Sequence, residues 1–275
     1  ADLDGGTQWA RIDLAAPVRL RELETLYADQ IQVVDEVSWD DTAQVVRATK
    51  QRRLGSLVLS EQGLSKPDPS MISAALLQGI RRAGLDRLAW NPELRQWRAR
   101  VAFLRRVEGQ ESRWPNLSDE ALLQTLGDWL GPYISGLTTL DRVTRLDLTQ
   151  PLHALLSWEQ QRQLEQWAPT HLTVPSGSSV RVEYQTPDLP ILAVRLQEMF
   201  GCKDTPSLVG GKIPVMLHLL SPARRPVQIT KDLSSFWKSA YLEVKKELRG
   251  RYPKHSWPDD PLTAPPTAKS KRRTR

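Results

Sequence analysis

The sequence has a single cysteine and no long apolar run. Cys202 has no second cysteine to pair with, so the 275 residues hold no internal disulfide and fit a reducing compartment. The longest apolar candidate, Ile213–Leu220, is interrupted by Pro214 and His218, far short of a membrane span. The four histidines are scattered without zinc spacing, and the first residues do not form a signal peptide. We therefore expect a cytoplasmic protein without a membrane span.

Motifs of nucleotide hydrolysis and acyl transfer are also missing. The only Gly-Lys pair, Gly211-Lys212, is followed by Ile213, and Pro206 stands where a Walker motif needs its leading glycine. There is no Gly-x-Ser-x-Gly elbow. We expect no catalytic residue, no metal site and no cofactor in this chain. The first methionine is Met71, which favours a chain that is part of a longer protein.

The charge is unevenly distributed along the chain. Residues 212–275 hold 15 Lys and Arg against 5 Asp and Glu, whereas residues 1–211 hold 23 against 27. The net charge of +6 therefore averages a slightly acidic main part and a strongly basic last quarter. Such a basic segment is typical of proteins that bind a polyanion, and nucleic acid is the first candidate.

The pattern of apolar residues predicts an α+β protein in four parts. Residues 1–66 read as an OB-like β-barrel segment, with strands at 9–14, 31–39, 42–50 and 54–59 and a helix near 20–27. Residues 67–168 form a helical region whose helices start at the cap signals Asp68-Pro69, Asn91-Pro92, Ser118 and Ser157. Residues 169–261 form a mixed α/β domain, and residues 262–275 a disordered basic tail.

The mixed domain is expected to contain two helices. Pro190–Phe200 has helical spacing at Ile191, Val194 and Met199 and ends at Gly201. Asp232 caps a long basic helix that runs to about Leu248. Strands are expected on both sides of the Pro175–Ser178 turn and over 212–220.

The main candidates for phosphate contact lie on this long helix and in the segment that precedes it. Cationic side chains neutralise phosphates, and aromatic side chains such as Tyr252, His255 and Trp257 can stack on unpaired bases. The alternative is a solvated basic face above an ordinary core helix, with the aromatic residues packed beneath it. The candidate nucleic-acid-binding residues are Arg224, Arg225, Lys231, Lys238, Lys245, Lys246 and Arg249.

A second set of cations lies in the first part of the chain. They lie along one predicted strand and its turn: Arg47, Lys50, Arg52 and Arg53. An OB-like barrel could present them to single-stranded nucleic acid. They equally fit an edge strand whose charges discourage aggregation. The arginines of 95–106 are interpreted as a solvated helix face or as partners in ion pairs between domains.

Several segments together carry a resemblance that extends over nearly the whole chain. The segments are Arg98–Arg106, Leu172–Gly177, Leu219–Ala223, Arg225–Thr230 and Leu248–His255. In order and spacing they resemble the C-terminal region of the HrpB family of bacterial DEAH-type ATP-dependent helicases. The run Gly250-Arg-Tyr-Pro-Lys-His255 is specific in this context.

The resemblance implies an accessory region of an RNA helicase. Members of the family carry two RecA-like motor domains, which bind ATP and Mg²⁺, and none of their motifs is present here. The expected partners are therefore single-stranded nucleic acid, RNA in preference to DNA, and the helicase motor domains. A protein-interaction module that recruits a partner to the helicase is the alternative.

Overall fold

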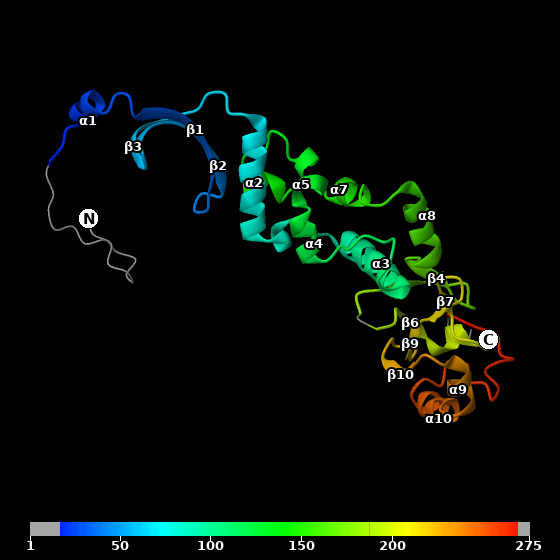
Figure 1. Ribbon diagram of the computed structural model, residues 1–275. Coiled ribbons are helices and arrows are strands. Elements are labelled where there is room, and N and C mark those ends of the chain that lie inside the picture. The colour runs from blue at the N-terminus through cyan, green and yellow to red at the C-terminus, as the bar shows by residue number, and fades with distance from the viewer. Residues whose placement is uncertain (1–16, 187, 269–275) are drawn as a thin grey trace, which may run out of the picture. The chain divides into compact units, whose positions relative to one another are not determined.

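The computed structural model describes residues 17–186 and 188–268 (Figure 1). These residues fall into two compact units. Of the described residues, the first unit comprises 17–88 and 126–146, and the second comprises 89–125, 147–186 and 188–268. The sequence had suggested a single helical region over 67–168, but the structure divides these helices between the two units.

The first unit combines an antiparallel β-meander with short helices. Its strands are β1 (Ile31–Asp40), β2 (Val45–Leu54) and β3 (Leu57–Gly63), in the order β1-β2-β3. Its helices are α1 (Leu20–Leu26), α2 (Pro69–Ala83), η1 (Leu85–Arg87), α5 (Leu126–Trp129), η2 (Gly131–Tyr133) and α6 (Leu140–Val143). The predicted OB-like barrel is not confirmed, because β1 and β3 are not paired within the described residues. The strand predicted over 9–14 lies outside them.

Helix α2 packs directly on the meander. The Asp68 side chain accepts a hydrogen bond from the Ser70 backbone N–H and caps this helix, as the sequence predicted. Trp39 of β1 lies flat against the α2 backbone at Gly79, where a Cβ would come within 2.3 Å of the indole ring. Gly79 is therefore required for the close approach of helix and sheet.

The second unit contains four helices followed by a five-stranded sheet and a helical end. The first helices are α3 (Pro92–Glu108), α4 (Asp119–Gln124), α7 (Thr149–His153) and α8 (Trp158–Trp167). The sheet has the order β10-β9-β6-β5-β4 and consists of β4 (His171–Thr173), β5 (Ser179–Glu183), β6 (Ile191–Arg195), β9 (Met216–Leu220) and β10 (Pro226–Thr230). A small pair, β7 (Ser207–Leu208) and β8 (Ile213–Pro214), precedes β9.

The helix predicted over Pro190–Phe200 is wrong. Residues Ile191–Arg195 form β6, and Leu196–Met199 form the short 3-10 helix η3. Burial in β6 alternates, with Leu192 and Val194 inside, and the strand pairs in parallel with β9. A short apolar run fits helix and strand periods alike, and here a partner strand distant in the sequence decides the outcome.

The long basic helix is two helices. Asp232 caps the first one as predicted, but α9 ends at Lys238 and α10 begins at Tyr241 (Figure 1). Ser239 Oγ donates to the Ser235 carbonyl at 2.8 Å, a local bond that competes with the regular helix ladder. The helix predicted after Ser118 is likewise divided, into α4 and α5, and α5 belongs to the first unit.

The end of the described chain packs across η3. We call this segment, residues 261–267, the strap. The Gly201 N–H donates to the Pro261 carbonyl at 2.9 Å, and the Thr267 N–H donates to the Gln197 carbonyl at 3.0 Å. The tail predicted over 262–275 is therefore packed as far as residue 268, and residues 269–275 lie outside the described part. Residues 196–200 beneath the strap are all buried.

Candidate nucleic-acid interface

Six of the seven candidate cations near the C-terminus are exposed. None of the six forms an ion pair with any residue that the structure describes. They lie in the β9–β10 turn, between β10 and α9, at the end of α9 and on α10. We call them the C-terminal basic set: Arg224, Arg225, Lys231, Lys238, Lys246 and Arg249.

Lys245 does not belong to this exposed set. It lies on the inward face of α10, four residues after Tyr241 and three before Leu248, and is 8% exposed. Its ammonium donates to Asp259, and this hydrogen bond is the main reason why the pKa of the Asp259 carboxyl lies below its usual value. The candidate Lys245 is therefore buried and paired, as the spacing from Tyr241 to Leu248 indicates.

The aromatic residues downstream are used inside the fold. The Trp257 indole N–H donates to the Tyr252 carbonyl at 2.9 Å, and the Tyr252 and His255 rings meet edge to face with centroids 6.3 Å apart. All three side chains are half-buried. They contact one another rather than forming an open stacking platform.

The cations of the first unit are mostly neutralised by carboxylates. Arg47 Nε lies 2.5 Å from Asp40 Oδ2, and Arg52 reaches Glu24 of α1 at 2.5 Å. Arg53 pairs with Glu36 at 3.2 Å. All three carboxylates belong to β1 or α1, so the pairs join neighbouring elements of the first unit. Lys50 is exposed and has no ion pair among the described residues, but it stands opposite Asp35 in the β1–β2 register.

The arginines of α3 mainly bind backbone carbonyls. Arg100 is 3% exposed; its Nε donates to the Ala168 carbonyl at 2.5 Å and it pairs with Glu165 at 2.8 Å. Arg105 donates to the Trp114 carbonyl at 2.7 Å. These contacts lie within the second unit, and of the five arginines only Arg95 and Arg106 are exposed, so neither expectation describes α3 as a whole. A carbonyl partner fixes the guanidinium but leaves its full charge in place.

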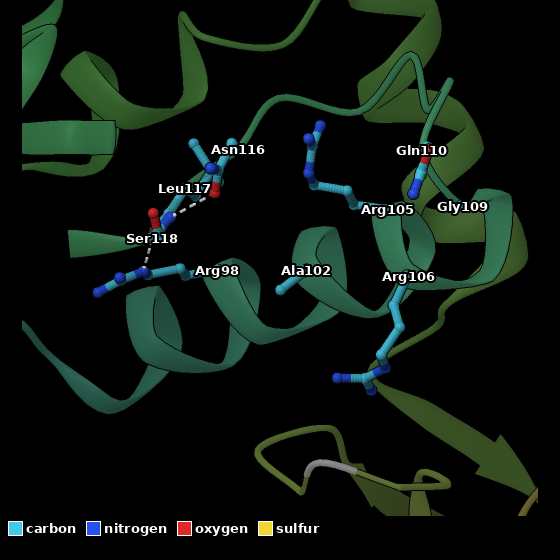
Figure 2. A pocket seen from close by; sticks show the side chains of 9 residues that line it. All are labelled: Arg98, Ala102, Arg105, Arg106, Gly109, Gln110, Asn116, Leu117 and Ser118. Carbon is cyan, nitrogen blue, oxygen red and sulfur yellow. Dashed lines mark hydrogen bonds between the residues drawn. The ribbon is translucent and has the colours of Figure 1, made fainter. Parts of the chain in front are cut away.

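Three of these arginines line a pocket of about 500 Å³ between the C-terminal half of α3 and the loop that follows it (Figure 2). Arg98 donates to the Leu117 carbonyl at 2.5 Å and pairs with Asp119 at 2.7 Å. Arg105 and Arg106 have carbonyl partners but no carboxylate among the described residues. This arginine pocket was not predicted from the sequence, although residues 98, 102, 105 and 109 have the spacing of a single helix face.

The structure offers no metal centre in its described part. No group of three or more His, Cys, Asp or Glu side chains is arranged there to hold an ion. Nor does any described helix have the length and apolar composition needed to cross a membrane. What the second unit does provide is the fixed arginines of the arginine pocket and the exposed cations of the C-terminal basic set.

Comparison with known proteins shows which helicases the chain resembles. Residues 129–261 match the family described as ATP-dependent helicase C-terminal, and residues 30–64 match the connector region of the ATP-dependent RNA helicase HrpB. The ATP-dependent RNA helicase HrpB of Escherichia coli (strain K12) is 43% identical over 263 residues, which cover 96% of this chain. The chain belongs to the HrpB family.

Solved structures of HrpB support the same assignment. The crystal structure of the E. coli DExH-box NTPase HrpB superposes with a TM-score of 0.72 at 43% identity and covers 98% of this chain. A crystal structure of the E. coli DEAH/RHA helicase HrpB gives a TM-score of 0.62 at 42% identity over 83% of the chain. The chain spans about a third of the length of these HrpB proteins and corresponds to their C-terminal region.

Proposed function

We propose that this chain is an RNA-holding accessory region of an ATP-dependent HrpB helicase. Its cations grip the phosphates of a single strand without reading its sequence, while the motor domains of the helicase hydrolyse ATP with Mg²⁺. The chain alone carries no ATPase site and packs on that motor. Its partners are RNA in preference to DNA and the motor domains, and its location is the cytoplasm.

One observation carries this proposal. The exposed cations of the C-terminal basic set have no carboxylate partners among the described residues, whereas three of the four candidate cations of the first unit are paired. Exposed cations without carboxylate partners can replace the counterions of a phosphate backbone. The arginine pocket adds two further charges that no carboxylate among the described residues cancels.

Salt-dependent RNA binding tests the proposal. For single-stranded RNA, the logarithm of the affinity should fall linearly with the logarithm of the salt concentration, by about 0.7 per phosphate neutralised. The triple variant Lys238→Glu, Lys246→Glu, Arg249→Glu should lose most of the affinity. A control with the same change in charge is Lys66→Glu, Arg87→Glu, Arg142→Glu, three exposed sites of the first unit. Equal losses in both variants, or no binding at low salt, would refute the proposal.

The second candidate function is protein recruitment. Ile229 on the edge strand β10 is 54% exposed, and Leu242 on α10 is 61% exposed. An edge strand with an exposed apolar side chain can accept a strand from another protein. This function predicts that Ile229→Lys abolishes a protein contact while RNA binding persists.

A further inference from the structure

A second pocket lies on another face of α3. It has a volume of about 410 Å³ and is bounded by the N-terminal half of α3, by α7 and α8, and by β4 and β5, all within the second unit. The lining residues of α3 include Glu93, Gln96, Trp97 and Arg100, a stripe with helical spacing. The arginine pocket uses residues 98, 102 and 105 instead, so the two pockets are separated by α3 itself.

Gln96 brings an unsatisfied acceptor to this second pocket. Its side chain is 2% exposed, and its amide nitrogen donates to the Val182 carbonyl. Because a carbonyl can only accept, the amide nitrogen must face Val182. This bond therefore fixes the orientation of the amide and does not use Oε1. Gln96 Oε1 is buried and has no hydrogen-bond partner among the residues that the structure describes. A buried amide oxygen without a partner is costly, so a ligand N–H at this point is favoured.

Flat rings form part of the same wall. Trp97 and His153 are stacked with centroids 4.9 Å apart and planes inclined by 25°. Burial lowers the pKa of the His153 imidazole, so the ring is neutral at pH 7. A neutral stacked pair offers a surface for another planar ring.

The charges around this pocket are balanced, unlike those of the arginine pocket. Arg100 pairs with Glu165 at 2.8 Å, and Arg181 pairs with Glu183 at 3.3 Å. Glu93 is exposed and has no ion pair among the described residues, so it adds a further acceptor. This composition disfavours a phosphate and favours an uncharged planar group that donates N–H bonds.

We propose that this second pocket binds one unpaired nucleobase, which stacks on the Trp97–His153 pair and donates an N–H to Gln96 Oε1. A base of a bound RNA strand and a free nucleoside share this chemistry. Where the base belongs to RNA, the inference rests on the proposed function above; where it belongs to a free nucleoside, it does not.

Nucleoside binding by the whole chain tests this site. In saturation-transfer NMR with adenosine, cytidine, guanosine and uridine at millimolar concentration, we expect base protons to receive saturation. Intermolecular NOEs to the Trp97 indole should locate the base in the unsubstituted protein. His153→Ala should weaken binding between about fivefold and a hundredfold, since stacking on one aromatic ring contributes this much. His153→Phe keeps a flat ring and should keep binding, and Gln150→Ala, on the same helix but outside the pocket, should have no effect.

Competition separates the two sources of the base. A single-stranded RNA decamer that displaces the nucleoside, while an abasic decamer does not, identifies the RNA base; displacement by neither identifies a free nucleoside. Both results support the site. No saturation with any of the four nucleosides, no NOE to Trp97, or unchanged binding in a folded His153→Ala protein would overturn it.

The failure of this inference differs from a failure of the proposed function. If only the nucleobase pocket is wrong, RNA still binds with its salt dependence and still responds to the C-terminal triple variant. If only the RNA-holding function is wrong, nucleosides still bind and the triple variant leaves their affinity unchanged.

Discussion

Cations of the same type have different surroundings in the two units. In the first unit, arginines of β2 and α2 lie against carboxylates of β1, α1 and the β1–β2 turn. At the end of the second unit, six exposed cations have no such partner among the described residues. Net charge alone does not distinguish these situations, because what matters is whether the fold places a carboxylate opposite each cation. The comparison predicts that paired cations contribute to folding and unpaired ones to binding.

The largest effect is expected for the most buried paired cation. Arg100→Ala removes the donors to the Leu164 and Ala168 carbonyls and leaves both without this partner inside the second unit. The free energy of unfolding should fall by about 3–5 kcal/mol. Arg100→Lys should not restore it, because an ammonium cannot reproduce the planar fork. Urea unfolding measures the change, and Arg95→Ala on the exposed side of α3 is the control; equal losses would contradict this interpretation.

Adjacent lysines of α10 give a sharper contrast. Lys245→Glu places a negative charge at a buried site beside Asp259 and should destabilise the protein by about 2–4 kcal/mol. Lys246→Glu changes the charge equally at an exposed site and should alter stability by no more than about 0.5 kcal/mol. Among variants that remain folded, Lys246→Glu should reduce RNA affinity more than Lys245→Glu does. Thermal unfolding together with fluorescence anisotropy tests both statements, and similar stability losses would remove the distinction between the two lysines.

The two candidate sets should differ in the salt dependence of RNA binding. Arg224→Ala with Arg225→Ala removes two unpaired cations and should reduce the slope by about 1.4. Arg52→Ala with Arg53→Ala removes two paired cations and should leave the slope unchanged, with a stability loss of about 1 kcal/mol or less per pair. Anisotropy titrations at several salt concentrations measure both slopes. A larger change in the second variant would reverse the comparison.

The smallest effect is expected from pH. The pKa of Asp259 is lowered by its hydrogen bond from Lys245, so the carboxylate stabilises the folded state at pH values above 3.8, its usual value. This contribution is lost as the pH falls below 3.8 through the lowered folded-state pKa. The stability difference between the unsubstituted protein and Asp259→Asn should therefore be constant near pH 6 and shrink toward pH 3. Chemical unfolding across this range measures it, and a difference that grows on acidification would contradict the assignment.

Local signals were sufficient to predict where five of the described helices begin. The side chains of Asp68, Asn91, Ser118, Ser157 and Asp232 each accept the expected backbone N–H at a helix start. Capping depends on a few consecutive residues, so the sequence contains the whole interaction. The hairpin around Pro175–Ser178 was predicted for the same reason and is confirmed.

Features that depend on distant partners were not predictable in this way. The strand β6 exists because β9 pairs with it from more than twenty residues away, and the continuous basic helix is interrupted at Ser239. The arginines of α3 donate to backbone carbonyls of other segments. Every residue has such a carbonyl, so residue type does not indicate which one is the partner. In the candidate site, the exposed cations were recognisable from composition, whereas the buried position of Lys245 and the acceptor left free on Gln96 required the packing of the second unit.

The strap across η3 has a consequence for synthesis. Five consecutive buried residues, Leu196–Phe200, are covered by a segment that extends to Thr267, about 70 residues further along the chain. At translation rates of about 5–20 residues per second, this buried stretch waits roughly 3.5 to 14 seconds for its cover to be made. During that interval the Gly201 N–H and the Gln197 carbonyl lack the backbone partners that the strap gives them in the folded unit. The backbone contacts of the strap can therefore form only after all strands of the five-stranded sheet have been synthesised.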